Sequence, residues 1–376
     1  MNFLFISEHL PIDTYASEVV FYRHFKLLVE NGHNVHILTD QNSFTNRKKD
    51  LLDQFHIHIL PNRMWYYLPF KPYGILKKIR FYEYYNSYAK KIIAEQKIDK
   101  LIGFIHGNFL TTFSAYVQKK SRLPLISFFH DDTNELNFRT NTKSINKNTI
   151  EVLNASSKVL IASEAFKDNW GKFSHKFLLL YPIPAIKNKV KIQKLNLKNH
   201  KIGYSGTVYN EILPALNKFS SYLAKLSSDL TIIGNNEKTC QLANIYNELI
   251  CLPLFNTAEE SNEYLISNCN ICLIAYPEQI NEMPWIKTCF PSKFIQYCML
   301  DMPTIIIAPN DSAIGKWCIV NNWILFSNVY DFTIIKNLLD QAATNSNVAK
   351  QVRYLKEKVF DPQITHKRLE EILLSE

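Results

Sequence analysis

The segment Pro291-Ser292-Lys293 combines residue types that suit an anion at the start of a helix. The first backbone N–H groups of a helix have no partner within it, and the helix dipole makes that end positive. Lys293 adds a full positive charge in the first turn, where helices usually carry acids. One turn later, the amide of Gln296 could hold ribose hydroxyls. We therefore predict a diphosphate site here; the alternative is an ordinary amphipathic helix that leads into a buried strand.

His130 stands at the carboxyl end of the apolar run 127–129 and is followed by Asp131 and Asp132. Two acids make an unusual context for a core histidine, so we predict a site role for His130 rather than a packing role. The acidic pair could also suggest a metal-binding motif. The layout described below argues against that motif, and we expect no metal.

Short apolar runs rich in β-formers alternate with helical stretches along the whole chain. A helix is predicted over 17–31, ended by Gly32. Strands are predicted at 3–7, 35–38, 56–60, 100–104, 124–129, 158–162 and 177–181, and again at 201–205, 230–234, 249–252, 270–276, 304–308 and 323–326. This alternation predicts parallel α/β architecture.

The Lys- and Asn-rich stretch 186–200 lacks periodicity and is predicted to be a linker. It separates a first doubly wound, Rossmann-like domain (1–185) from a second (201–360), with a terminal helix over 361–376 that packs back on the first. Ligands bind at the carboxyl ends of such sheets and between domains, so we expect one central cleft. Neither half has GxGxxG and the chain has only nine glycines, which excludes a classical dinucleotide enzyme.

The formal charge of +9 favours anionic partners. Between Arg63 and Lys91 stand seven Lys or Arg, one acid and ten aromatic residues. This mixture suits an anionic membrane surface; the alternative is a helix with one core-facing aromatic side and one solvated basic side. No nucleic-acid-binding motif is visible, so we expect no nucleic acid.

The chain shows no signal-peptide pattern at its start, and its longest apolar runs have strand length. Its seven cysteines form no regular framework, which favours a reducing compartment. We expect a cytoplasmic protein, peripheral on the inner face of the plasma membrane. Cys269 and Cys272 have CxxC spacing within a predicted strand, and we expect buried thiols there rather than zinc.

A helix that begins with PSK and continues to Gln296-Tyr297, followed by the Asp301–Ile305 pattern D-x-P-x-I, resembles the donor-binding helix of glycosyltransferase family 4. Further segments match this family in the same order along the chain. They are Ser-Phe-Phe-His-Asp at 127–131, Lys-Val-Leu-Ile-Ala-Ser-Glu at 158–164, Lys-Ile-Gly-Tyr-Ser-Gly at 201–206, Leu-Thr-Ile-Ile-Gly at 230–234 and Asn-Ile-Cys-Leu-Ile-Ala-Tyr-Pro at 270–277.

The resemblance implies a GT-B enzyme whose first domain binds the acceptor and whose second binds a nucleotide sugar. It also implies retaining transfer without a metal. His130 would contact the transferred sugar near the reacting carbon. Gly206 and Thr207 would bring backbone N–H groups to the phosphates of the donor. Ser292 and Lys293 would neutralise the diphosphate, and Gln296 would hold the ribose.

The sequence departs from the family pattern at three places. The usual acidic pair, eight residues apart, is replaced by Thr288 and Gln296, so Glu278 or Glu282 is the candidate substitute carboxylate. The basic pair after the glycine turn is missing, since 209–211 read Tyr-Asn-Glu. The N-terminal glycine-rich loop is replaced by 13–17, Asp-Thr-Tyr-Ala-Ser.

We therefore expect transfer of a sugar from a nucleotide diphosphate donor, without a separate cofactor. Among such donors, we expect a UDP-sugar. The expected acceptor is a glycan or lipid-linked glycan in bacterial lipopolysaccharide or capsule synthesis. Two alternatives remain. One is a nucleotide-sugar epimerase of the same fold, and the other is a non-catalytic GT-B-like binding subunit, which the missing acidic pair favours.

Overall fold

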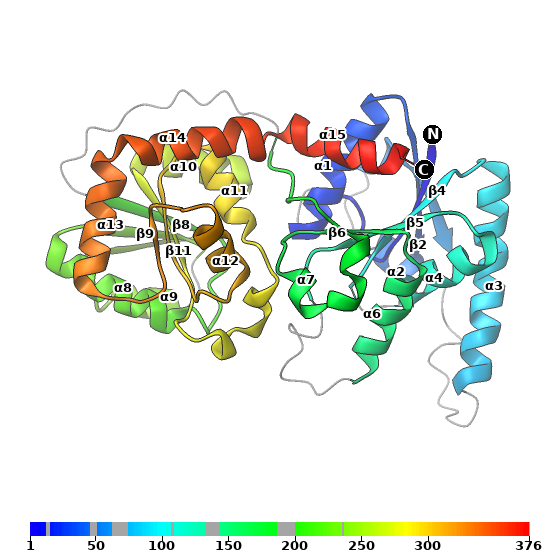
Figure 1. The fold of residues 1–376 in the computed structure, drawn as a ribbon, viewed down its shortest axis with the longest axis horizontal. Helices are drawn as coiled ribbons and strands as arrows, with labels where there is room; N and C mark the ends of the chain where they lie inside the picture. Colours follow the sequence, from blue (N-terminus) through cyan, green and yellow to red (C-terminus); the bar gives the residue numbers. More distant parts are fainter. Residues whose placement is uncertain are drawn as a thin grey trace. The chain divides into compact units, whose positions relative to one another are not determined.

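The computed structural model describes residues 1–12, 16–45, 51–61, 74–106, 109–132, 143–185, 200–234 and 237–375. The chain divides into two compact units. The first comprises Met1–Ile183 and His366–Glu376, and the second comprises Pro184–Thr365. Each unit is a parallel sheet with helices packed against it (Figure 1).

The sheet of the first unit has seven strands in the order β3-β2-β1-β4-β5-β6-β7, all paired in parallel. In chain order they are β1 (Asn2–Ile6), β2 (Asn34–Asp40), β3 (His56–Leu60), β4 (Lys100–Phe104), β5 (Leu125–Phe129), β6 (Lys158–Ile161) and β7 (Phe177–Leu179). The strand order reverses between β1 and β4. Such a switch point leaves a crevice at the carboxyl ends of the two strands.

Helices cover both faces of this sheet, so successive residues of a strand enter different cores. Phe3 and Phe5 pack with α1 (Ala16–Glu30) and α15 (Pro362–Leu374), whereas Leu4 and Ile6 face the opposite core. That second core is closed by α3 (Gly74–Glu95), α4 (Phe109–Ser121) and α6 (Lys143–Ala155). The remaining helical segments are α2 (Gln41–Thr45), α7 (Phe166–Asn169) and the 3₁₀ turn η3 (Gly171–Lys176).

Helix α15 belongs to the first unit from His366 onward. Its Leu369 and Leu373 are fully buried in the core with α1, and the ring nitrogens of His24 and His366 lie 3.3 Å apart. Figure 1 shows α15, in red, beside α1. The end of the chain is thus held by apolar burial and by a buried contact between two imidazoles.

The sheet of the second unit has six parallel strands in the order β10-β9-β8-β11-β12-β13. They are β8 (Lys201–Ser205), β9 (Asp229–Ile233), β10 (Leu249–Leu252), β11 (Ile271–Ala275), β12 (Thr304–Ile307) and β13 (Phe326–Ser327). Its strand order reverses between β8 and β11, which places the crevice of this unit at those two strand ends.

Several helices of the second unit begin with a side-chain cap. The Thr257 hydroxyl accepts a hydrogen bond from the Glu260 backbone N–H at 3.1 Å at the start of α10, as in a capping box. The α-helices are α8 (Leu213–Leu226), α9 (Glu237–Ala243), α10 (Ala258–Asn268), α11 (Ser292–Met299), α12 (Ala313–Val320), α13 (Phe332–Thr344) and α14 (Ser346–Tyr354). Two 3₁₀ turns, η4 (Ile280–Glu282) and η5 (Pro284–Lys287), and a π-helical turn, η6 (Leu355–Val359), complete the unit.

The predicted fold class, two Rossmann-like parallel-sheet units, is confirmed. The strand predicted at 323–326 is wrong, since only Phe326–Ser327 pairs with β12. Trp323 is buried against Phe294, and its indole N–H donates to the Thr304 carbonyl at 3.1 Å. The first residues of this apolar run therefore pack against the sheet, and the chain joins the sheet as a strand only at Phe326.

Two predicted segments fall partly or largely outside the described residues. The linker at 186–200 is described only at His200, and the segment from Arg63 to Lys91 is described only from 74, as part of α3. There Tyr82 and Tyr85 are buried, whereas Tyr84 and Tyr88 are exposed. Membrane contact through this segment stays a prediction. No described helix combines the length and apolar character needed to cross a bilayer.

Candidate functional site

In the second unit, α11 begins at Ser292, with the extended Pro291 as its N-cap residue. The face that includes Phe294 and Tyr297 is buried, whereas Ser292 is exposed. The helix thus packs firmly on the sheet while its first turn stays accessible to solvent. Exposed N–H groups at a helix start form a binding site for an anion. Gln296 lies one turn further on and is half-buried.

The turn after β8 approaches α11 very closely. Gly206 has a φ of +105°, and a Cβ atom built there would lie 2.8 Å from Cε of Lys293. Glycine is therefore required for two reasons, the backbone conformation and the space for the lysine. The Gly206 N–H donates to the Ile233 carbonyl at 2.8 Å. The sheet thus already uses this N–H, and its contact with the phosphates stays a prediction.

Lys293 extends over the ring of Tyr204, near the end of β8. Its Nζ atom donates to the Tyr204 hydroxyl at 2.9 Å and lies 4.0 Å from the ring centroid. The hydroxyl in turn donates to the Thr207 carbonyl at 3.1 Å. Burial lowers the pKa of Lys293 to about 7. The structure thus gathers Lys293, Gly206 and Thr207 at the switch point of this sheet.

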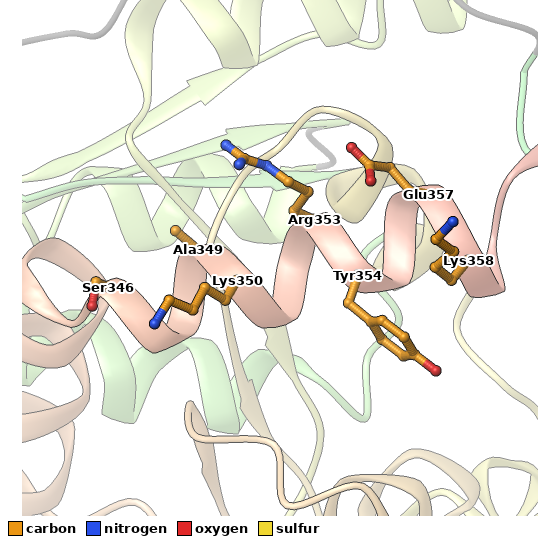
Figure 2. A pocket seen from close by; sticks show the side chains of 7 residues that line it. All are labelled: Ser346, Ala349, Lys350, Arg353, Tyr354, Glu357 and Lys358. Atoms are coloured by element: carbon orange, nitrogen blue, oxygen red, sulfur yellow. The ribbon is translucent and has the colours of Figure 1, made fainter.

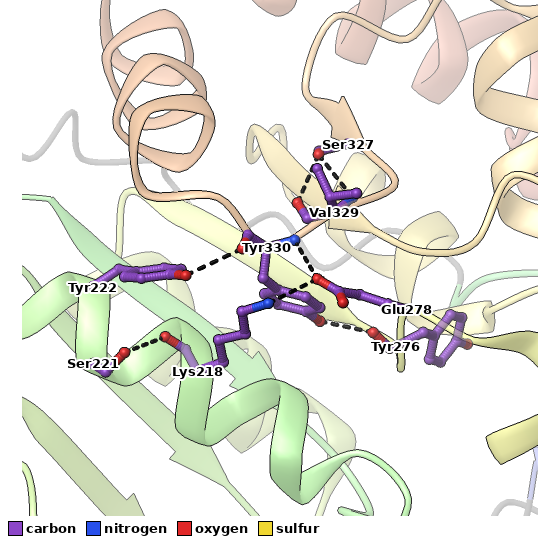
Figure 3. A network of polar contacts seen from close by, with 8 residues as sticks. All are labelled: Lys218, Ser221, Tyr222, Tyr276, Glu278, Ser327, Val329 and Tyr330. Atoms are coloured by element: carbon purple, nitrogen blue, oxygen red, sulfur yellow. Dashed lines mark hydrogen bonds and ion pairs between the residues drawn. The ribbon is translucent and has the colours of Figure 1, made fainter.

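Glu278 has a structural role in the second unit (Figure 3). Its Oε1 atom accepts hydrogen bonds from Lys218 Nζ at 3.0 Å and from the Tyr330 backbone N–H at 2.8 Å. These bonds, with that of Tyr330 first, lower the pKa of the Glu278 carboxyl. The Tyr330 hydroxyl donates to the Tyr276 carbonyl at 2.8 Å. Glu278 therefore joins the loop after β11 to α8 and to the segment before α13, whereas Glu282 is exposed in η4.

In the first unit, His130 follows β5 and is 8% exposed. Its Nδ1 atom lies 3.0 Å from the Ser17 hydroxyl, and its ring stacks on Phe21 with centroids 5.4 Å apart. Burial and then the nearby His106 lower the pKa of His130 to about 3. The imidazole is therefore neutral at pH 7. It can offer a hydrogen bond to a ligand, but no positive charge.

Two further histidines, His9 and His106, follow β1 and β4, the strands at the switch point of this sheet. Their rings lie 4.5 Å apart at 84°, and the Nδ1 atom of His9 is 3.2 Å from a carboxylate oxygen of Glu18. Burial lowers the pKa of His106 to about 4, and its Nδ1 atom has no hydrogen-bond partner among the described residues. With His130 they form a histidine cluster at the carboxyl ends of three adjacent strands.

The sequence prediction did not include His9, His106 or Glu18. A signal for the two histidines was available, because each comes within three residues of a predicted strand end. Asp132, one of the two acids after His130, is buried, and its carboxylate accepts a hydrogen bond from the Trp170 indole at 2.7 Å. Among the described residues, no group of three or more His, Cys, Asp or Glu is arranged to hold a metal.

A shallow surface pocket of about 460 Å³ lies along α14 and η6 (Figure 2). None of the predicted site residues lines it. Its lining residues are Ser346, Ala349, Lys350, Arg353, Tyr354, Glu357 and Lys358. The predicted CxxC pair lies at and just before the start of β11. Cys269 and Cys272 are both buried, and burial raises the pKa of each thiol.

The roles of the two candidate carboxylates, Glu278 and Glu282, can be distinguished by the thermal stability of their alanine variants. Replacing Glu278 with Ala removes two hydrogen bonds and should cost about 1 kcal/mol, since the carboxylate is partly exposed. This corresponds to a Tm lowered by roughly 2–4 °C. Glu282→Ala is the matched control and should change the Tm by less than about 1 °C, because its side chain is exposed. Equal melting curves, measured by calorimetry, would contradict the structural role of Glu278.

Residues 17–176 match the sequence family described as Glycosyltransferase Family 4. No curated protein matches the chain. Among solved structures, HepE of Anabaena in complex with UDP and glucose is 13% identical, with 99% of each chain covered and a TM-score of 0.65. Sucrose-phosphate synthase of Thermosynechococcus elongatus is 13% identical, with 99% of this chain and 98% of that chain covered and a TM-score of 0.64.

The lipopolysaccharide outer core galactosyltransferase WaaB is also 13% identical, with 94% of this chain and 98% of that chain covered and a TM-score of 0.59. At this level of identity, the solved structures establish the fold over nearly the whole chain. The sequence match over 17–176 adds the family likeness. Together they show that the chain has a GT-B fold and that its first unit resembles glycosyltransferase family 4.

Proposed function

We propose that the protein transfers a sugar, with retention, from a nucleotide diphosphate donor to a glycan or lipid-linked glycan. The donor that we propose is a UDP-sugar. The contact of Lys293 with the turn after β8 is the observation that carries this proposal. It places a cation and the accessible start of α11 at the switch point of a parallel sheet. The complexes of HepE with UDP and with UDP-glucose support a uridine donor.

The chemistry needs positive charge beside the leaving group. When the bond between the anomeric carbon and the diphosphate oxygen breaks, negative charge grows on the diphosphate. An acceptor hydroxyl forms the new glycosidic bond and gives up its proton to the leaving diphosphate. A cation and fixed N–H dipoles that are already in place stabilise the departing charge. We assign these roles to Lys293 and to the first turn of α11, at Ser292. Gln296 would hold the ribose, and no cofactor or metal is assigned.

We assign His130 to the transferred sugar. Its imidazole is neutral and held by contacts to Ser17 and Phe21, which suits a hydrogen bond to a sugar hydroxyl. The acceptor that we propose is a glycan formed during bacterial surface polysaccharide synthesis. The likeness in fold to the lipopolysaccharide galactosyltransferase WaaB supports this class of acceptor.

A panel of donors tests the function. A ligand present at 100 times its Kd adds about 2.7 kcal/mol to the stability of the protein, which raises the Tm by roughly 5–10 °C. We expect UDP-sugars to give this shift in thermal unfolding, and GDP-, CMP- and dTDP-sugars to give less. Absence of any shift across the panel would contradict the proposal. Conversion of the donor without an acceptor would indicate an epimerase, and binding without turnover would indicate a binding subunit.

Donor affinity should depend on pH through Lys293. Its pKa of about 7 in the free protein rises when a diphosphate binds, because the anion favours the charged ammonium. Affinity for UDP-glucose should therefore be constant below about pH 6 and fall above pH 7, toward tenfold per pH unit. Isothermal titration calorimetry between pH 5.5 and 9 measures this dependence. UDP-glucose suits the experiment because its esterified diphosphate keeps a constant charge.

Lys293→Ala and Lys293→Arg are the matched variants for that experiment. The alanine variant should lose about 1.5–3 kcal/mol of binding free energy and its pH dependence above 7. The arginine variant should stay charged and also lose the dependence. Unchanged affinity in Lys293→Ala would remove the phosphate assignment.

His130→Ala should lower kcat by roughly 100-fold, the effect of removing one hydrogen bond that is formed in the transition state. The Kd for UDP-glucose should change less than about twofold, because the histidine is assigned to the sugar and not to the nucleotide. Steady-state assays and calorimetry on the same preparation separate these two quantities. Full turnover in the variant would exclude His130 from the chemistry.

A further inference from the structure

Tyr204 is the principal described partner of the Lys293 ammonium. The hydroxyl accepts a hydrogen bond from Nζ at 2.9 Å, and the ring centroid lies 4.0 Å from the same atom. Both contacts favour the charged form of the lysine, one through a hydrogen bond and one through the negative face of the ring. The Tyr204 side chain is 2% exposed. It is therefore fixed in place before any ligand arrives.

The hydroxyl of Tyr204 also connects the lysine to the turn. It donates its own proton to the Thr207 carbonyl at 3.1 Å, so both hydrogen-bonding functions of the phenol are used. Burial raises the pKa of Tyr204, which keeps the phenol neutral and able to donate. The ammonium, the phenol and the turn therefore form one continuous chain of hydrogen bonds.

We propose that Tyr204 is a positioning residue that holds the Lys293 ammonium beside the turn after β8, ready for the diphosphate of the donor. This inference rests on the proposed function. The residues that follow the turn, 209–211, read Tyr-Asn-Glu and supply no second cation. In the described part of the chain, no carboxylate forms an ion pair with Lys293, and burial lowers its pKa. The phenol thus provides the orientation and the counter-dipole that a charged neighbour would otherwise supply.

Tyr297 offers a matched control on the same face of α11. It lies one turn after Lys293 and is fully buried, and its hydroxyl accepts a hydrogen bond from the Ser205 N–H at 2.9 Å. Tyr297→Phe removes a buried hydroxyl and weakens the same packing between α11 and the end of β8. It does not remove a partner of the ammonium. General loosening of the helix would therefore appear in both variants, whereas loss of positioning would appear only in Tyr204→Phe.

The first test is made without any donor. Competitive labelling of the full-length protein with acetic anhydride across pH 6–10, read by mass spectrometry, gives the protonation midpoint of Lys293. In Tyr204→Phe the ring remains but the acceptor oxygen is lost, so the midpoint should move to lower pH by about one unit, a tenfold change in proton affinity. In Tyr297→Phe it should stay within about 0.3 unit of the wild type. Equal midpoints in wild type and Tyr204→Phe would overturn the proposal.

The second test uses UDP-glucose. Calorimetry at pH 7 should show affinity about tenfold lower in Tyr204→Phe and within about twofold of wild type in Tyr297→Phe. If lowering the pH to 5.5 restores affinity in Tyr204→Phe alone, the result would support the view that Tyr204 acts through the charge of Lys293. If the wild-type protein does not bind UDP-glucose, the proposed function fails, while the labelling midpoint still decides the role of Tyr204.

A crystal structure of the wild type with UDP-glucose covers the case in which Tyr204→Phe is not recovered folded. The Tyr204 hydroxyl should remain within hydrogen-bond distance of Lys293 Nζ while Nζ also contacts the diphosphate. Departure of the lysine from the tyrosine in that complex would overturn the positioning role.

Discussion

The packing of Lys293 against the turn after β8 is the constraint on which the second unit depends. A lysine brought out of water beside a strand end loses hydration, and that loss must be offset locally. The offset comes from the Tyr204 phenol and from the absence of a side chain at Gly206, which lets the aliphatic part of the lysine pass. The same desolvation makes the charge of the lysine responsive to an incoming anion. Binding and packing are therefore two consequences of one contact.

In the first unit, the side chains at the carboxyl ends of the central strands are histidines rather than a lysine. Burial keeps His106 and His130 neutral near pH 7, so these two side chains supply directed hydrogen bonds without charge. Neutral groups suit sugar hydroxyls, whereas a cation suits a diphosphate. The positions at the two switch points thus carry the two kinds of chemistry that a sugar transfer needs.

Most of the fold could be predicted because apolar runs and glycine turns are local signals. The start of α11 at Ser292 and the strand that ends before His130 both follow from such patterns. The contacts of the site could not be predicted in this way. That the Gly206 N–H bonds to Ile233, or that Tyr204 receives Lys293, depends on which strands lie side by side. His9 and His106 likewise become neighbours only because β1 and β4 pair, although they are 97 positions apart in the sequence.

The missing acidic pair is best understood together with these contacts. Glu278 is placed near the end of β11, but its carboxylate is bound to Lys218 and to the Tyr330 backbone, so it serves the packing of the second unit. Gln296 keeps the length and the hydrogen-bonding capacity of a glutamate at the donor helix without its charge. If the diphosphate binds as proposed, a negative carboxylate at position 296 would compete with it for Lys293, whose partner among the described residues is the Tyr204 phenol. A neutral amide avoids this competition.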